Sequence, residues 1–365
     1  MARVHNFNPG PAALPLPVLE RAQRELLDFE GSGMSIMEHS HRGKVYEKVH
    51  DEALERMRRL MAVPDTHEIL FLTGGATQQF AQVPMNLRAD GQSADYVIGG
   101  VWGKKAFKEA SHLGKARIAA TTELPDGRFL RVHKPSELSV DPKAAYLHIT
   151  SNNTVMGTQL HDWPEDPGIP IVCDMSSDIL SRPMDVSRFG VIYAGAQKNL
   201  GPSGVTVVIV RKDLIENGRK DIPFSLQYRT QAADKSLANT APTFAIYMLR
   251  NVLAWVEEAG GLAWAIDQTE KKSSALYKVL TERSDIFRLS VEPESRSKMN
   301  VVWNMAAPEL EAELVQRATA AGFVGLKGHR IVGGLRASIY NAVPLASVLA
   351  LCDFLRGYEP GRPGV

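Results

Sequence analysis

Cysteine is scarce in this sequence: 365 residues contain only Cys173 and Cys352, which stand far apart. Two distant thiols suit neither a disulfide framework nor a zinc site, so we expect free thiols and no metal centre. Long apolar runs are also missing, since the most apolar strand-like run covers only residues 205–210 and a membrane helix needs about 20 residues. The first residues carry no signal-peptide pattern. We therefore expect a cytoplasmic protein that does not span a membrane.

An excess of charge of either sign is absent as well. Lys and Arg number 42 and Asp and Glu 41, for a formal net charge of +1. A general nucleic-acid or membrane-surface binder would need a basic excess or stripe, so neither partner is expected. The chain also lacks a Gly-x-Gly-x-x-Gly motif after its first strand and a P-loop lysine, which disfavours a nucleotide-binding protein. Any anion must be bound by a few well-placed basic residues.

Short apolar strands alternate with helical segments between residues 45 and 210. Helical spacing of apolar residues predicts a helix over 45–61, and Gly74-Gly75 precedes a second helix start. The predicted strands cover residues 67–72, 96–98, 145–149, 169–173, 191–193 and 205–210. Alternation of this kind indicates an α/β domain built around a mostly parallel sheet.

The pattern changes after residue 211. Residues 217–243 are polar and irregular, and two helical stretches follow at 244–259 and 262–283, separated by Gly260-Gly261. Beyond them the sequence predicts strands at 299–305 and 335–340 and helices at 309–321 and 345–356. We therefore predict a large α/β domain over residues 15–260 and a smaller α+β domain formed by residues 1–14 and 261–365.

Two charged residues stand where predicted strands end. Asp174 closes one apolar strand, and Lys198 follows another in a turn rich in Gly and Pro. In an open α/β sheet, ligands bind beyond the carboxyl ends of the strands, so both side chains should face one crevice. Pyridoxal-5′-phosphate requires such a pair: a lysine amine that bonds its aldehyde and a carboxylate that keeps its ring nitrogen protonated. The glycine turn at residues 74–75 adds a helix start of the kind that binds phosphate.

Three segments resemble one family closely. Residues 40–43, 185–199 and 327–342 are similar to phosphoserine aminotransferases, which are fold-type I, class V pyridoxal-phosphate enzymes, and the resemblance runs from Phe7 to the last helix. It implies a large mostly parallel α/β domain with a smaller α+β domain. It also implies a homodimer with shared active sites.

The resemblance implies a role for each matching residue. Lys198 would form the Schiff base with the cofactor, Asp174 would pair with the ring nitrogen, and Trp102, expected in a glycine-rich loop, would stack on the ring. Other cofactor contacts are implied for Thr154 at the ring hydroxyl, for Gln197 and the backbone of Ala76 and Thr77 at the phosphate, and for Asn239 and Thr240 of the neighbouring subunit. The family commonly has arginine in place of Thr77 and serine near Pro9.

Two His-Arg pairs, His41-Arg42 and His329-Arg330, accompany a further Arg336. If both pairs meet in one cleft, they form a strong site for a dianion, because arginine binds phosphate oxygens in a fork. The resemblance implies that the pairs hold the substrate phosphate or the glutamate side chain while Arg336 binds the α-carboxylate. The predicted reaction exchanges an amino group between glutamate and 3-phosphohydroxypyruvate, giving 2-oxoglutarate and O-phosphoserine. The sequence leaves open whether the protein also forms 4-phosphohydroxythreonine.

Alternative functions remain at the level of sequence. An aminotransferase of the alanine–glyoxylate type would use the same cofactor but has no distal anion to bind. A cysteine desulfurase needs a reactive cysteine on a mobile loop, whereas Cys173 lies in a predicted strand and Cys352 in a predicted helix. A non-catalytic binding protein of the same fold would not need both Lys198 and Asp174.

Overall fold

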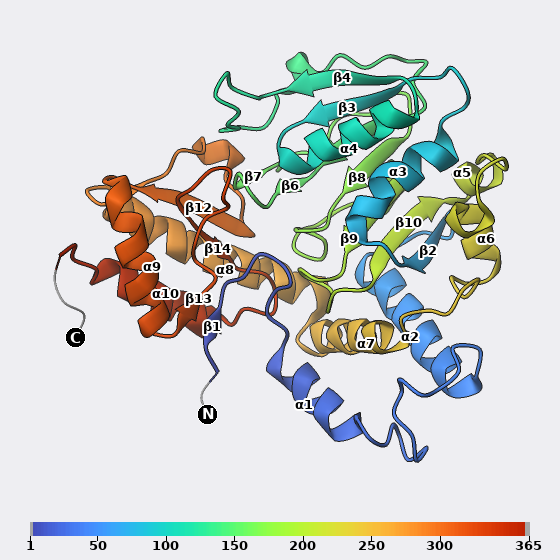
Figure 1. Cartoon of the computed structure of the whole chain (residues 1–365), viewed down its shortest axis with the longest axis horizontal. Helices are drawn as coiled ribbons and strands as arrows, with labels where there is room; N and C mark the ends of the chain where they lie inside the picture. Colours follow the sequence, from blue (N-terminus) through green and yellow to red (C-terminus); the bar gives the residue numbers. More distant parts are fainter. Residues whose placement is uncertain (1–2, 362–365) are drawn as a thin grey trace.

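A seven-stranded sheet organises the larger part of the molecule (Figure 1). Residues 3–361 are described by the computed structural model. The strand order is β2 (His67–Leu72), β10 (Thr206–Arg211), β9 (Val191–Gly195), β8 (Ile171–Asp174), β5 (Leu147–Thr150), β3 (Ala94–Ile98) and β4 (Ala116–Thr121). Strands β9, β8, β5, β3 and β4 are parallel neighbours, while β10 runs antiparallel to both β2 and β9. The predicted mostly parallel sheet is therefore confirmed.

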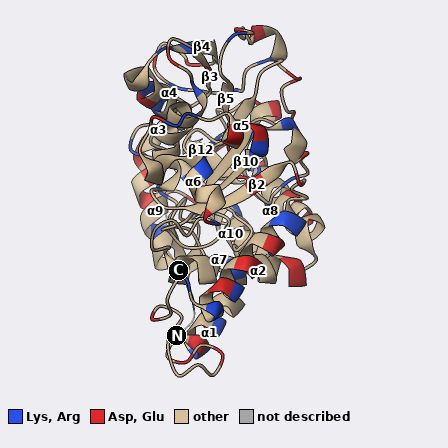
Figure 2. Cartoon of the chain, turned by 90° about the vertical axis from the view of Figure 1, so that its right-hand side faces the viewer, with Lys and Arg blue, Asp and Glu red and all other residues tan. Residues whose placement is uncertain are grey.

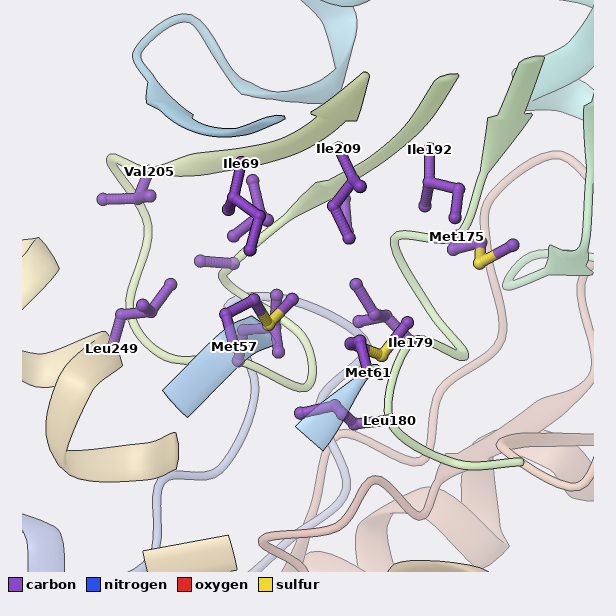
Figure 3. Packing of buried hydrophobic residues seen from close by; sticks show 14 of the residues in the cluster. Met57, Met61, Ile69, Met175, Ile179, Leu180, Ile192, Val205, Ile209 and Leu249 are labelled. Carbon is purple, nitrogen blue, oxygen red and sulfur yellow. The ribbon is translucent and has the colours of Figure 1, made fainter. Parts of the chain in front are cut away.

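Helices bury both faces of this sheet, which is why its strands are apolar throughout rather than alternating. On one face lie α2 (Lys44–Leu60) and α7 (Thr243–Glu258), whose side chains join Ile69, Ile209 and Ile192 in a core (Figure 3). Val208 and Val210 point to a second core on the opposite face. Four helices contribute buried side chains to this second core: α3 (Gly75–Leu87), α4 (Val101–Leu113), α5 (Lys212–Glu216) and α6 (Tyr228–Ala233). The strands are therefore packed on both faces, which fixes the positions of polar residues at their ends.

The third hydrophobic core is built from Phe7 and residues between 276 and 358. Its elements are α8 (Gly261–Glu282), the antiparallel sheet β11 (Phe287–Arg288), β12 (Asn300–Met305) and β14 (Leu335–Ser338), and the helices α9 (Glu311–Ala320) and α10 (Leu345–Arg356). Near the N-terminus, β1 (His5–Asn6) pairs in parallel with β13 (Phe323–Val324). The predicted domain limits stay a prediction, and residues 1–2 and 362–365 of the smaller domain lie outside the described part.

Short elements complete the chain. They are α1 (Leu16–Glu25), the antiparallel pair β6 (Asn152–Asn153) and β7 (Thr158–Gln159), and the 3-10 helices Pro135–Glu137, Val186–Arg188, Phe224–Leu226, Pro293–Ser295 and Pro308–Leu310. Basic and acidic residues are interspersed along the side of the molecule seen in Figure 2, as the near-zero net charge leads one to expect. Within residues 3–361, no helix has the length and hydropathy that crossing a bilayer requires.

Candidate active site

Lys198 lies in the turn after β9, at the carboxyl end of the parallel strands, as predicted. Its Nζ donates a hydrogen bond to Thr154 Oγ1 at 2.7 Å. The pKa of Lys198 is lowered to about 8, mainly by burial; the carboxylate of Asp174 opposes this shift and the charge of Arg336 adds to it. An amine with this pKa is unprotonated in a useful fraction of molecules near neutral pH and can act as a nucleophile or base.

Asp174 is the last residue of β8 and is buried. Its Oδ1 accepts hydrogen bonds from the backbone N–H of Ser176 at 2.9 Å and from the Ser176 hydroxyl at 2.6 Å. Burial raises the pKa of Asp174, and the neighbouring charge of Lys198 opposes that rise. Among residues 3–361 no donor engages Oδ2, so this oxygen can pair with a cationic group of a ligand.

Trp102 stands in the first turn of α4, so the expectation of a glycine-rich loop is wrong. Its ring centroid lies 5.7 Å from Lys198 Nζ. The glycines around it are there for close packing rather than for a loop: a Cβ on Gly103 would lie 3.0 Å from Val97 O, and a Cβ on Gly100 would lie 2.4 Å from Asn153 Oδ1. The helix start is thereby held against β6. The indole Nε1 is buried and has no partner within residues 3–361.

Thr154 connects Lys198 with the smaller part of the molecule. Its hydroxyl accepts from Lys198, and its backbone oxygen accepts from Arg336 Nη1 at 3.0 Å. Arg336 comes from β14 and is buried, yet no carboxylate of the described chain pairs with it, and its Nε has no partner there. A buried guanidinium without a carboxylate is suited to bind the carboxylate of a ligand.

The N-terminus of α3 follows β2 at the same edge of the sheet, because β2 is parallel to β9. Gly74 caps this helix at φ 87°, where a Cβ would overlap the Gln78 side chain. Ala76 is half-buried and Thr77 exposed in the first turn. The first N–H groups of a helix lack intrahelical acceptors and attract phosphate. Gln197, half-buried one residue before Lys198, folds its amide over Gly195.

Asn239 and Thr240 are exposed in the segment before α7. Asn239 lines a cavity of about 240 Å³ together with Thr73 and Gln78 of the same chain. Gln78 belongs to the first turn of α3, so the cavity adjoins the start of that helix. Within residues 3–361, no hydrogen bond joins either residue to Lys198 or Asp174.

One of the two His-Arg pairs lies at this site. His329 is half-buried in the loop between β13 and β14, and burial lowers its pKa, with Arg336, Arg330 and Lys105 lowering it further. The charges of Arg336, Arg330 and Lys105 therefore all act on the His329 ring. Lys105 was not singled out from the sequence, because helix α4, which brings it to the same side as Trp102, was not predicted.

The other pair, His41-Arg42, lies in the connection between α1 and α2. Figure 1 shows this connection at the lower end of the molecule, away from β13 and β14. Arg42 is exposed, whereas the Nε2 atom of His41 is buried without a partner among the described residues. Within residues 3–361, the segments that carry the two His-Arg pairs therefore lie in different parts of the molecule.

These residues fit the groups of pyridoxal phosphate. The nucleophilic Lys198 suits its aldehyde, the open Oδ2 of Asp174 suits its ring nitrogen, and the α3 start suits its phosphate. A thiol mechanism is disfavoured, because burial raises the pKa of both Cys173 and Cys352, the latter to about 11. Residues 3–361 contain no group of three His, Cys, Asp or Glu that could hold a metal ion.

Comparison with known proteins agrees with this site. Residues 4–351 match the family described as Aminotransferase class-V, and the chain belongs to that family. More narrowly, it is 51% identical over 357 residues, 98% of each chain, to phosphoserine aminotransferase of Lysinibacillus sphaericus (strain C3-41). The structure of phosphoserine aminotransferase from Bacillus circulans subsp. alkalophilus matches with a TM-score of 0.94 and 51% identity over 97% of both chains. That of the PLP-bound enzyme from Trichomonas vaginalis matches with 0.92 and 37%, covering 97% of this chain and 100% of that one.

Proposed function

We propose that this protein is a phosphoserine aminotransferase that exchanges an amino group between glutamate and 3-phosphohydroxypyruvate with pyridoxal phosphate as cofactor. The observation that carries the proposal is the chain of contacts from Lys198 through Thr154 to Arg336, with unpaired basic residues beside it. These contacts support a reactive amine close to a residue that would bind a carboxylate, with basic residues that would bind a second anion. The curated relatives at about 50% identity carry the same activity in their names.

The cofactor would be held by residues that stand at or just after the ends of several strands. Lys198 would bond its aldehyde, Asp174 would pair with its ring nitrogen, Trp102 would cover its ring, and Thr154 would lie near its hydroxyl. Its phosphate would be bound by Gln197 and by the backbone of Ala76 and Thr77, with Asn239 and Thr240 supplied by a second subunit. When bound, pyridoxal phosphate supplies an aldehyde that accepts the amino group and a ring that accepts electrons from the substrate Cα.

The protein itself moves the proton and orients the substrate. Lys198 Nζ, with a pKa of about 8, can take a proton from the substrate Cα and return it to a neighbouring carbon. Arg336 would hold the α-carboxylate, since it is buried and lacks a carboxylate partner within residues 3–361. Burial of Asp174 and Thr154 keeps water from the reacting atoms, which strengthens each charge interaction. Glutamate and O-phosphoserine share the two anions that this arrangement binds.

A homodimer with shared sites is part of the proposal. The connection between α1 and α2, which carries His41-Arg42, lies away from β13 and β14 in Figure 1, so we propose that a second subunit brings this pair to the distal anion. Mixing Lys198→Ala subunits with Arg42→Ala subunits tests this directly. If Arg42 acts across the interface, the mixed dimer contains one complete site and regains about half the wild-type activity per dimer. If Arg42 acts within its own subunit, every site stays defective and mixing restores nothing.

The substrate assignment is tested by the half-reaction. The purified protein, loaded with pyridoxal phosphate, is mixed with O-phosphoserine, glutamate, serine or alanine, and the cofactor absorbance is followed. We expect kcat/KM to be highest for O-phosphoserine and glutamate and to be at least a hundredfold lower for alanine, since each lost charged hydrogen bond removes about 1.5–3 kcal/mol. A preference for serine over O-phosphoserine would contradict the proposed substrate.

An enzyme of the alanine–glyoxylate type is the second candidate, and the same panel decides between the two. Alanine has no distal anion, so the basic residues His329, Arg330 and Lys105 would have no group of this substrate to bind. The non-catalytic alternative is tested by Lys198→Ala, which we expect to abolish turnover.

We propose a cytoplasmic location, supported by the two unpaired buried thiols.

A further inference from the structure

Two ammonium groups lie around one indole ring at the start of α4. Lys105 Nζ is 4.5 Å from the centroid of the Trp102 ring, and Lys198 Nζ is 5.7 Å from the same centroid. Trp102 and Lys105 are three residues apart in α4, so their side chains lie on the same side of the helix. Lys105 therefore belongs to the surroundings of Lys198 although it is exposed and comes from outside every motif that identified the site.

The charge around Lys105 is not neutralised by the protein. Within residues 3–361, no carboxylate lies within ion-pair distance of Lys105, of Arg330 or of Arg336. Its neighbour Lys104 behaves differently, since its Nζ lies 2.5 Å from Glu123 Oε1. Like charges brought together without counter-charges repel one another, and their repulsion is relieved when an anion binds among them.

We propose that Lys105 is a specificity-determining residue that binds the distal anion of the substrate together with His329 and Arg330 and favours a phosphate dianion over a carboxylate. The inference rests on the proposed function, because it names a further residue of the same substrate site. Three features support it: the position of Lys105 beside Trp102, its lack of an acidic partner, and its electrostatic effect on His329.

The preference follows from the charge of the substrate. Coulomb attraction scales with the product of the two charges, so one ammonium stabilises a dianion about twice as much in free energy as a monoanion at the same distance. Lys105 is the fifth residue of α4 and lies close to the N-terminal end, where the helix dipole favours negative charge. Neither effect acts on a substrate without a distal anion.

The test compares Lys105→Ala with Lys104→Ala, an adjacent exposed lysine, in the holoenzyme. Binding is measured by calorimetry with 3-phosphonopropionate, which carries a carboxylate and a phosphonate but no amino or keto group, and with glutarate, which carries two carboxylates. We expect Lys105→Ala to weaken 3-phosphonopropionate about tenfold and glutarate about threefold, as the loss of one charged contact predicts. Lys104→Ala should change neither affinity, and Lys105→Arg should restore most of the loss.

Turnover supplies the second readout. Lys105→Ala should lower kcat/KM for O-phosphoserine by about tenfold through KM and leave alanine unchanged. Equal losses for alanine and O-phosphoserine, or an unchanged affinity for 3-phosphonopropionate, would overturn the role of Lys105. If the wild-type enzyme does not prefer O-phosphoserine but Lys105→Ala still weakens 3-phosphonopropionate, only the proposed substrate fails. If the wild type binds neither phosphorylated compound, both proposals fail.

Discussion

At the scale of single residues, burial moves Lys198 and Asp174 toward their neutral forms. It lowers the pKa of Lys198 and raises that of Asp174, and each residue partly offsets the shift of the other through its charge. The amine consequently titrates near pH 8 instead of above 10. The Asp174 carboxylate thus adjusts the reactivity of the lysine, in addition to the contact that we propose for its Oδ2 with the cofactor ring nitrogen.

Asp174→Asn should lower the pKa of Lys198 below about 8, because it removes the negative charge that favours the ammonium form. In the cofactor-free protein, the rate of Lys198 labelling by an amine-reactive reagent is measured between pH 6 and 10, with the modified lysine identified by mass spectrometry. The midpoint of the wild type should lie near pH 8 and that of the variant at lower pH. Lys104→Ala serves as the control, and a midpoint that rises in Asp174→Asn would contradict the electrostatic coupling.

Lys272 is a second buried lysine, and its effect concerns stability. It is fully buried in α8 and donates hydrogen bonds to the backbone oxygens of Tyr340 at 2.7 Å and Val343 at 3.2 Å. Burial lowers the pKa of Lys272 to about 7. Between pH 7 and about 10 the unfolded chain binds more protons at this residue than the folded one, so its contribution to stability rises with pH in that window.

Lys272→Met should therefore reduce the increase in the free energy of unfolding between pH 7 and 10. The reduction is at most about 1.4 kcal/mol per pH unit, the limit for one titrating group. Urea unfolding at several pH values measures it, and Lys271→Met, an exposed neighbour, is the control. An identical pH slope in the wild type and Lys272→Met would show that Lys272 does not titrate in this range.

At the scale of elements, strand ends and helix starts supply the site. Asp174 ends β8, Lys198 follows β9, and Thr77 stands in the first turn of α3 after β2. Most predicted elements agree with the observed ones to within three residues, because a strand buried on both faces is apolar until a polar residue ends it. Helix α4 was missed because Gly100 and Gly103 resemble a loop in sequence, although contacts with Asn153 and Val97 require them.

Helix α3 offers a test at this scale. Its first turn presents backbone N–H groups and the Thr77 hydroxyl but no formal charge. Thr77→Arg should tighten pyridoxal-phosphate binding about tenfold, because it adds one charge-assisted contact to the phosphate. Equilibrium dialysis of the cofactor measures the change. Thr77→Gln, which is long but uncharged, should not reproduce it, and an unchanged dissociation constant in Thr77→Arg would place the phosphate away from this helix.

At the scale of the whole molecule, a buried polar network joins the two parts of the chain. Asn152 Nδ2 donates to Asn300 Oδ1 at 2.7 Å, and Asn300 Nδ2 donates to Ser338 Oγ at 2.9 Å and to Tyr340 Oη at 3.1 Å. The Tyr340 hydroxyl in turn donates to Pro9 O at 2.9 Å. Arg336 lies two residues before Ser338 on β14, so this network helps to set its position against Thr154.

Asn300→Ala should lower the free energy of unfolding by about 1–3 kcal/mol, because it leaves buried partners without hydrogen bonds. It should also raise KM for substrates with an α-carboxylate more than it lowers kcat, since Arg336 moves while Lys198 does not. Urea unfolding and steady-state kinetics measure the two effects. Ser290→Ala, an exposed residue of the same part of the chain, is the control. A loss confined to kcat would show that the network does not position Arg336.

The sequence by itself determined the fold class and the positions of the two central residues of the site, Asp174 and Lys198. Asp174 and Lys198 could be found because each follows a local apolar run. The fold class could be found because such runs alternate with segments of helical spacing. Both the mostly parallel sheet and the aminotransferase family are confirmed. The tertiary structure decided which basic residues share a site. The charges of Lys105 and Arg336 act on His329, and Asn152 donates a hydrogen bond to Asn300 across 148 positions. Contacts of this kind depend on the packing of distant elements, which no local pattern encodes.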